Sequence, residues 1–145
     1  MPTTLGPKYT IDWRGRPPHM LQEDIPVWYR FLQREGRAFT ALYYDVLLGG
    51  PWLSPEEERD PLKRGWRANV AKRADALAEL EKQLWIIEVA LDPGLRAAGQ
   101  LITYLNLWNE DPKSDKPPVM VMVCQRLDPD LGATMGSLGV LVFLV

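Results

Sequence analysis

Cysteine and histidine are almost absent from this chain of 145 residues, which has one of each. The lone cysteine, Cys124, cannot form an intrachain disulfide, and because it lies in an apolar run we expect a buried, inert thiol. With His19 as its only histidine, a single chain cannot build a zinc site of the Cys/His type.

Long apolar runs and a strong net charge are also missing. No apolar stretch is long enough to span a bilayer as a helix. No basic and then apolar leader opens the sequence, so we expect no secretion by a signal peptide. The formal net charge of −2 gives none of the global basic character typical of nucleic-acid or membrane partners. A local basic run is either a solvated face or a DNA contact made by Lys63, Arg64 and Arg67.

The composition that remains is ordinary for one α/β domain, with 46% hydrophobic and 25% charged residues. Residues 1–22 carry several prolines and glycines without periodicity, which predicts an extended N-terminal arm before a domain over residues 23–145. Such an arm cannot build a core of its own. We therefore expect it to contact another chain, with Trp13 as the anchor and Arg14 and Arg16 at the rim. The alternative is a strap over its own sheet.

Residues 23–145 predict a mixed central sheet with flanking helices, in the order helix, three strands, helix, strand, short helix, strand. Between the first two strands, a capping box at Ser54 and Glu57 is followed by Pro61, which should limit any helix there to about two turns. The expected elements are a helix capped by Asp24 and stopped at Gly36, strands 39–48, 71–78 and 84–90, a helix from Asp92 to about Asn109, strand 119–124, a short helix capped by Asp128, and strand 139–145.

A carboxylate stands in the middle of the apolar strand 84–90. A buried, unpaired carboxylate is costly, so Glu88 needs a partner or a purpose. A tight turn over residues 80–83 would place Asp75 opposite Glu88 and Arg73 opposite Ala90, all on one face of the sheet. The repulsion between the two acids could then be relieved by a divalent cation or by Arg73.

These residues resemble the core of the PD-(D/E)XK, or restriction-endonuclease-like, nuclease superfamily. The resemblance implies that Asp75 and Glu88 are metal-binding acids, with Mg²⁺ or Mn²⁺ as the cofactor, and that Gln100 and Tyr104 are site residues on the following helix. The segments that carry it are Arg73-Ala-Asp75, Trp85-Ile-Ile-Glu88-Val-Ala90 and Gly99-Gln100-Leu-Ile-Thr-Tyr104.

The chain departs from the family at Ala90, where the superfamily carries a lysine that orients or activates the attacking water. Arg96 is the nearest basic alternative. This departure favours a non-catalytic structural or interaction protein on a degenerate nuclease frame, whose vestigial acids are neutralised by Arg73 without a bound cation. The alternative is a purely structural role for these residues, in which the acids form a structural pair, Gln100 is bonded to the sheet and Tyr104 closes the core.

The chain also resembles small nuclease-like proteins encoded among the structural genes of tailed bacteriophages. That resemblance implies an oligomeric virion component, for instance at a head–tail junction or in a capsid, and a location in the virion or the bacterial cytoplasm. The alternative function is an active DNA endonuclease that depends on Mg²⁺ or Mn²⁺.

Overall fold

A mixed sheet of five strands forms the centre of the molecule in the computed structural model, which describes residues 2–145. The strands lie side by side in chain order, the first three as an antiparallel meander and the last two parallel to the third. The predicted mixed sheet with flanking helices is confirmed. The strands are β1 (Ala41–Leu48), β2 (Lys72–Glu79), β3 (Leu84–Ala90), β4 (Pro118–Cys124) and β5 (Leu141–Leu144).

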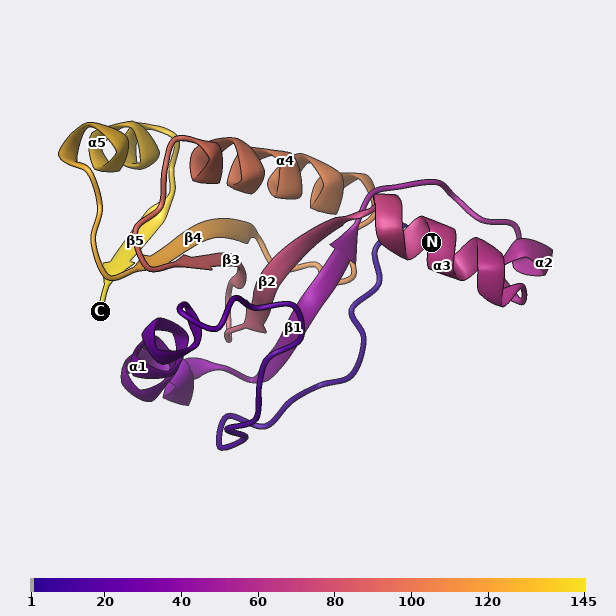
Figure 1. Cartoon of the computed structure of the whole chain (residues 1–145), viewed down its shortest axis with the longest axis horizontal. Coiled ribbons are helices and arrows are strands. Elements are labelled where there is room, and N and C mark those ends of the chain that lie inside the picture. Colours follow the sequence, from indigo (N-terminus) through magenta and orange to yellow (C-terminus); the bar gives the residue numbers. More distant parts are fainter. Residues whose placement is uncertain (1) are drawn as a thin grey trace.

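Helices cover both faces of this sheet (Figure 1). The helix α1 (Ile25–Glu35), followed by the 3-10 turn η1 (Gly36–Ala38), lies on one face. The helices α4 (Arg96–Glu110) and α5 (Pro129–Ser137) lie on the other. Both connect parallel neighbours, β3 to β4 and β4 to β5, and successive right-handed crossovers in one direction place their helices on the same face.

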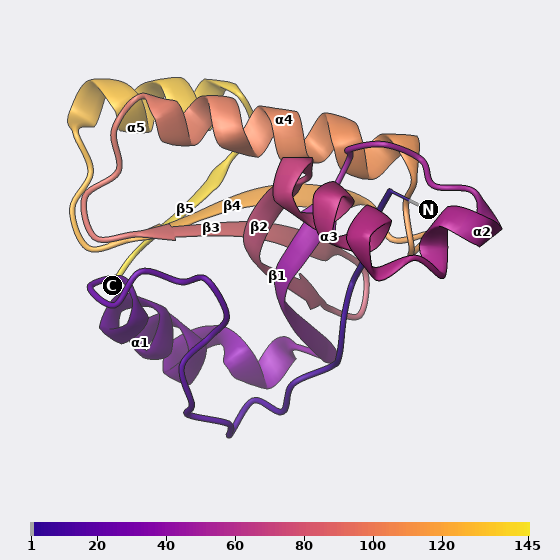
Figure 2. The same cartoon turned by 45° about the vertical axis from the view of Figure 1, so that its right-hand side comes forward.

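A small helical lobe projects from one side of the sheet (Figure 2). It consists of α2 (Pro55–Glu58), which forms the expected capping box between Ser54 and Glu57, and α3 (Pro61–Val70). The helix that the capping box begins ends before Pro61, as predicted. Pro61 then begins a second helix, α3, which was not expected; proline is tolerated there because the first turn of a helix does not use its missing N–H.

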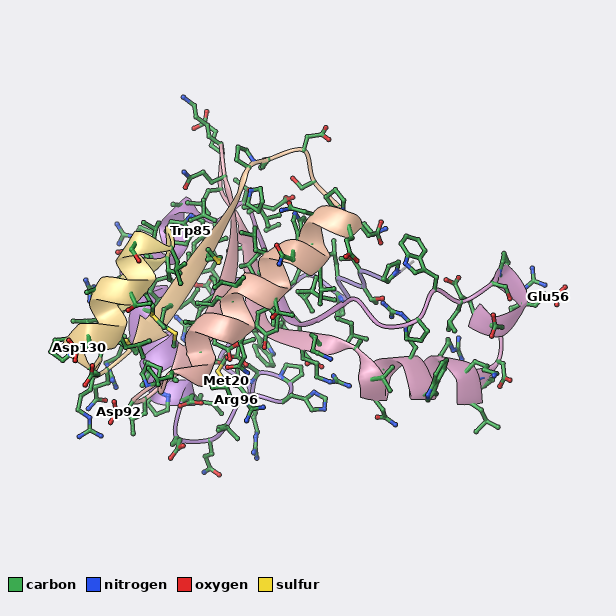
Figure 3. All side chains as sticks on the ribbon, turned by 90° about the horizontal axis from the view of Figure 1, so that it is seen from above. Met20, Glu56, Trp85, Asp92, Arg96 and Asp130 are labelled. Atoms are coloured by element: carbon green, nitrogen blue, oxygen red, sulfur yellow. The ribbon has the colours of Figure 1, made fainter. Side chains whose placement is uncertain are left out.

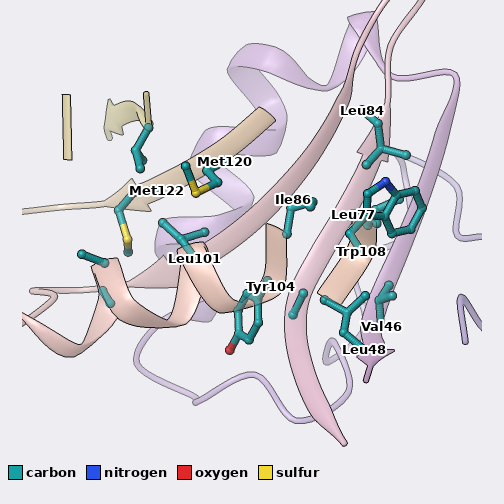
Figure 4. Packing of buried hydrophobic residues seen from close by; sticks show 14 of the residues in the cluster. Val46, Leu48, Leu77, Leu84, Ile86, Leu101, Tyr104, Trp108, Met120 and Met122 are labelled. Atoms are coloured by element: carbon teal, nitrogen blue, oxygen red, sulfur yellow. The ribbon is translucent and has the colours of Figure 1, made fainter. Parts of the chain in front are cut away.

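The core is divided by the sheet into two clusters. Along β3, Leu84 and Ile86 face α4 and α5, whereas Trp85 and Ile87 face α1. Figure 4 shows Leu101, Tyr104 and Trp108 of α4 lying against the first cluster. Strands β3 and β4 are therefore covered on both faces, as expected for continuously apolar strands in a parallel arrangement.

The predicted hairpin register is confirmed, with Ala76 opposite Ile87 and Glu79 opposite Leu84. Strand β1 departs from simple alternation at Asp45, which has a φ of +51°. Tyr43 and Val46 consequently both belong to the cluster under α4, although they are three residues apart. This kink brings the Asp45 side chain toward the site described below.

Two predicted helix starts needed correction. Helix α4 begins at Arg96, whereas Asp92 lies in the turn before it. Asp24 occupies the cap position of α1 but makes no capping bond. Its carboxylate accepts the backbone N–H of Leu91 at 2.9 Å, which ties the start of α1 to the end of β3.

The N-terminal arm folds back on its own domain. The expectation that it would extend away from the domain was therefore wrong, and the alternative of a strap over its own sheet is the one observed. Thr4 pairs with Leu47 of β1, and the backbone N–H of Tyr9 donates to the carbonyl of Leu42. Trp13 packs on Tyr9 and Tyr44. The free edge of β1 and its aromatic face supply the partners that the arm cannot provide for itself.

Two of the three expected interface residues are therefore engaged within the chain. Trp13 lies in that aromatic group, Arg14 donates to the carbonyls of Ile11 and Trp13, and Arg16 lies on the surface beside Tyr29. Their contact with a partner chain stays a prediction.

Within residues 2–145, no helix is long and apolar enough to cross a membrane.

Because the arm packs on its own domain, truncating two adjacent residues of the arm should have very different effects on stability. Met20 is 2% exposed in the cluster under α1, whereas Leu21 is 63% exposed. We expect Met20→Ala to lower the free energy of unfolding by about 2–4 kcal/mol. The control Leu21→Ala should change it by less than about 0.5 kcal/mol. Urea denaturation of the two variants measures the contrast, and equal effects would show that the arm is not part of the core.

Candidate functional site

Two carboxylates meet where β2 and β3 stop pairing through their backbones. The ladder ends at Ala76 and Ile87, and beyond it the Asp75 Oδ2 atom accepts the backbone N–H of Val89 at 2.9 Å. Glu88 shares a hydrogen bond with Asp75. The prediction that Asp75 and Glu88 lie together on neighbouring strands is confirmed.

Burial dominates the electrostatics of this acid pair. Loss of contact with water, and then the charge of Asp75, raises the pKa of Glu88 to about 9. Burial also raises the pKa of Asp75 above its ordinary range. Glu88 therefore keeps its proton at neutral pH, and the hydrogen bond to Asp75 favours that form. The Oε1 atom of Glu88 is buried and has no hydrogen-bond partner among residues 2–145.

Arg73 is not the counter-ion that we expected for the pair. Its Nη1 atom lies 2.7 Å from Asp45 Oδ2, and its Nη2 atom donates to the carbonyl of Ala68 at 2.9 Å. The kink in β1 brings Asp45 within reach of Arg73. Arg73 is thus engaged elsewhere and does not neutralise the Asp75–Glu88 pair.

A pocket of about 300 Å³ opens beside the pair. Asp24 reaches it from the start of α1, and burial raises the pKa of that carboxyl. Ala90 and Arg96 also line it, and Ala90 in addition packs against the cluster under α4. Figure 3 labels Arg96 at the start of α4, and His19 and Leu21 of the arm line the same pocket as Arg96.

Gln100 lines the same pocket, and its side chain hydrogen-bonds the hydroxyl of Tyr104. Tyr104 is 4% exposed, and burial followed by the charges of Glu88 and Asp75 raises its pKa. Gln100 therefore presents its amide to the pocket, while Tyr104 supports it from the core.

A second hollow, of about 420 Å³, adjoins the first and shares Arg96 and Gln100 with it. Lys72 lies at its wall. The surface beside the acid pair therefore carries two cationic side chains from different elements, β2 and the start of α4. Such a surface attracts anionic groups such as phosphates.

The basic run on α3 is only partly available to a partner. Arg67 is 8% exposed, and its guanidinium donates to Thr4 Oγ1 at 2.9 Å and to the carbonyl of Gly49 at 3.5 Å. The arm and the turn after β1 cover it, and its contact with DNA stays a prediction. Contact through Lys63 and Arg64, both exposed, stays a prediction.

The site offers few side chains that could hold a metal. Within residues 2–145, no three His, Cys, Asp or Glu side chains gather closely enough to hold an ion. No family model, curated protein or solved structure matches this chain. The geometry of the site is therefore what indicates its chemistry.

Three residues near the pair were not recognised in the sequence as site residues: His19, Asp24 and Asp45. Asp24 was interpreted as a helix cap, which is the usual role of aspartate before Ile-Pro. Asp45 stands within the apolar strand 41–48 as Glu88 does within its own, and that signal could have identified it. The position of His19, between two prolines and a methionine, gave no comparable signal.

The raised pKa of Glu88 predicts how stability depends on pH. Between its ordinary value of 4.5 and about 9, the folded state keeps a proton that the unfolded state has lost, so stability falls as pH rises through this window. Glu88→Gln removes this loss. We expect the variant to match the wild type near pH 4.5 and to exceed it at pH 8 by on the order of 2 kcal/mol.

Urea denaturation at the two pH values measures this difference. Glu81→Gln, at an exposed position in the β2–β3 turn, is the matched control and should show the pH dependence of the wild type. A Glu88→Gln variant that is less stable than the wild type at pH 8 would contradict the account.

Proposed function

We propose that this chain is a divalent-metal-dependent hydrolase of phosphodiesters in nucleic acid, with Asp75 and Glu88 as its metal-binding acids. One observation carries the proposal: the two acids are buried together, and Arg73 is bonded to Asp45 instead. Arg73 was the reason for expecting a vestigial pair without a cation. Because Arg73 does not neutralise the pair, the carboxylate oxygens are available to a cation, and this supports the enzyme although Ala90 departs from the superfamily's pattern.

The residues present fit a hard cation such as Mg²⁺ or Mn²⁺. Glu88 Oε1 is a buried oxygen without a partner, and carboxylate oxygens are the ligands that these ions prefer. Mg²⁺ usually takes one or two carboxylates and completes its shell with water and substrate oxygens, so two acids suffice. When bound, the cation would neutralise the pair and polarise a phosphodiester.

The surroundings of the pair support a phosphate-bearing substrate. Arg96 and Lys72 line the adjoining hollows, where they can attract phosphate oxygens. The element order α1, β1, β2, β3, α4, β4, interrupted by η1 and by the inserted α2 and α3, has an antiparallel meander followed by a parallel strand, which also supports the resemblance to the restriction-endonuclease-like frame.

The test is cleavage of end-labelled single- and double-stranded oligonucleotides by the full chain. We expect products with Mg²⁺ or Mn²⁺ and none with excess chelator. Asp75→Asn and Glu88→Gln should lower the rate by at least about 100-fold, which corresponds to several kcal/mol of lost charge stabilisation. Glu81→Gln should cut at the wild-type rate. Absence of cleavage with both metals, or cleavage that survives Glu88→Gln, would refute the proposal.

A second candidate, a structural or interaction protein such as a virion component, is favoured by the α2–α3 lobe. Large apolar side chains are exposed on α3, Leu62 at 83% and Trp66 at 49%, and in the segment before α2, Trp52 at 58%. Exposed apolar residues gathered on one projecting element mark protein contacts. Sedimentation of the wild type and of Leu62→Asp/Trp66→Asp tests this reading, which requires self-association that the double variant loses.

A further inference from the structure

His19 and Asp45 form a hydrogen-bonded pair at the mouth of the pocket. His19 Nδ1 lies 2.8 Å from Asp45 Oδ2, across 26 positions of sequence. Among residues 2–145, these are the two non-glycine residues with positive φ, +61° and +51°. Side chains disfavour this region, and residues held there cluster at functional sites. Both residues that form this hydrogen bond have disfavoured backbone conformations, which is typical of a bond that serves function.

The turn before α1 holds the histidine in place. The backbone N–H of Met20 donates to the carbonyl of Pro17 at 3.2 Å, and both residues are buried. In this four-residue turn, Pro18 occupies the second position and a residue with positive φ occupies the third. This is the pattern of a type II turn, in which the third position favours glycine. His19 occupies that position, and its side chain is 65% exposed. The only histidine of the chain thus stands on a fixed support where glycine would fit better.

The aspartate fixes which ring nitrogen is free. Asp45 lies in β1 opposite Asp75, between the pairs Tyr44–Ala76 and Val46–Ala74, and Arg73 holds its carboxylate. An ionised carboxylate only accepts hydrogen bonds, so the proton of the neutral ring lies on Nδ1. Nε2 is then left with a free lone pair, as in other carboxylate–histidine pairs.

His19 lines the same pocket as the acid pair and Ala90. Ala90 stands where the resemblance expects the lysine that activates water, so the proposed hydrolase lacks a base on β3. We propose that His19 is the general base of this site and that Asp45 is its positioning residue. This inference rests on the proposed function.

The step uses only groups already described. Nε2 of His19 takes a proton from the attacking water as the water oxygen bonds to phosphorus. The bond from phosphorus to the leaving oxygen breaks with its electron pair, and that oxygen takes a proton from solvent. His19 then releases its proton to solvent, so that one water yields one phosphate monoester and one hydroxyl.

The first test is His19→Gly in the full chain. Because glycine relieves the strained turn, we expect an equal or higher melting temperature and unchanged Mn²⁺ binding by calorimetry. Oligonucleotide cleavage should fall by on the order of 100-fold. Added imidazole should restore part of the rate. Wild-type cleavage by His19→Gly, or loss of cleavage together with a lower melting temperature, would overturn the role as general base.

The second test does not depend on activity. Because the chain has one histidine, its imidazole signals in nitrogen NMR are unambiguous. We expect the neutral Nδ1–H tautomer, weakened in Asp45→Asn, and a shift of Nε2 on adding a phosphorothioate oligothymidylate with calcium chloride. An Nε2–H tautomer, or an Nε2 signal that does not respond, would overturn the inference.

The two proposals can fail separately. A wild type that does not cleave refutes the proposed function and the base role with it. A wild type whose cleavage depends on Glu88 but not on His19 refutes the base role alone.

Discussion

The bond from the backbone N–H of Val89 to the carboxylate of Asp75 determines how the site is laid out. Before it, β2 and β3 pair through their backbones; beyond it, β3 pairs only with β4, from Glu88 opposite Met122 to Ala90 opposite Cys124. The carboxylate replaces the missing strand partner. The two strands can therefore separate, and the pocket opens between them without leaving the Val89 amide unsatisfied.

The sheet and its two apolar clusters hold side chains and backbone conformations that by themselves lower the stability of the fold. The acid pair is held together against its own repulsion, and His19 and Asp45 are held in disfavoured backbone conformations. Both features lie where the strand pairing is irregular, at the end of the β2–β3 ladder and at the kink in β1. The rest of β3 and β4 is covered by an apolar cluster on each face. Local strain of this kind persists when the surrounding structure determines it, and it is typical of functional sites.

The sequence predicted what depends on local pattern. Glu88 was recognisable because charge inside an apolar strand is rare, and the short turn after β2 fixed its register against Asp75. The partner of Arg73 was not predictable, because it depends on the kink at Asp45 in a strand nearly thirty residues earlier. The burial of Arg67 likewise depends on the arm, whose irregular sequence carries no signal for where it docks.

The central claim is that the buried acid pair is a cation site that holds a proton until the cation arrives. Because metal binding to protonated ligands releases protons, the most direct measurement is calorimetric titration of the full chain with Mn²⁺ at pH 7, in two buffers of different ionisation enthalpy. The account predicts one site, release of about one proton per ion bound, and loss of both in Glu88→Gln. No binding, or binding unaffected by Glu88→Gln, would contradict it.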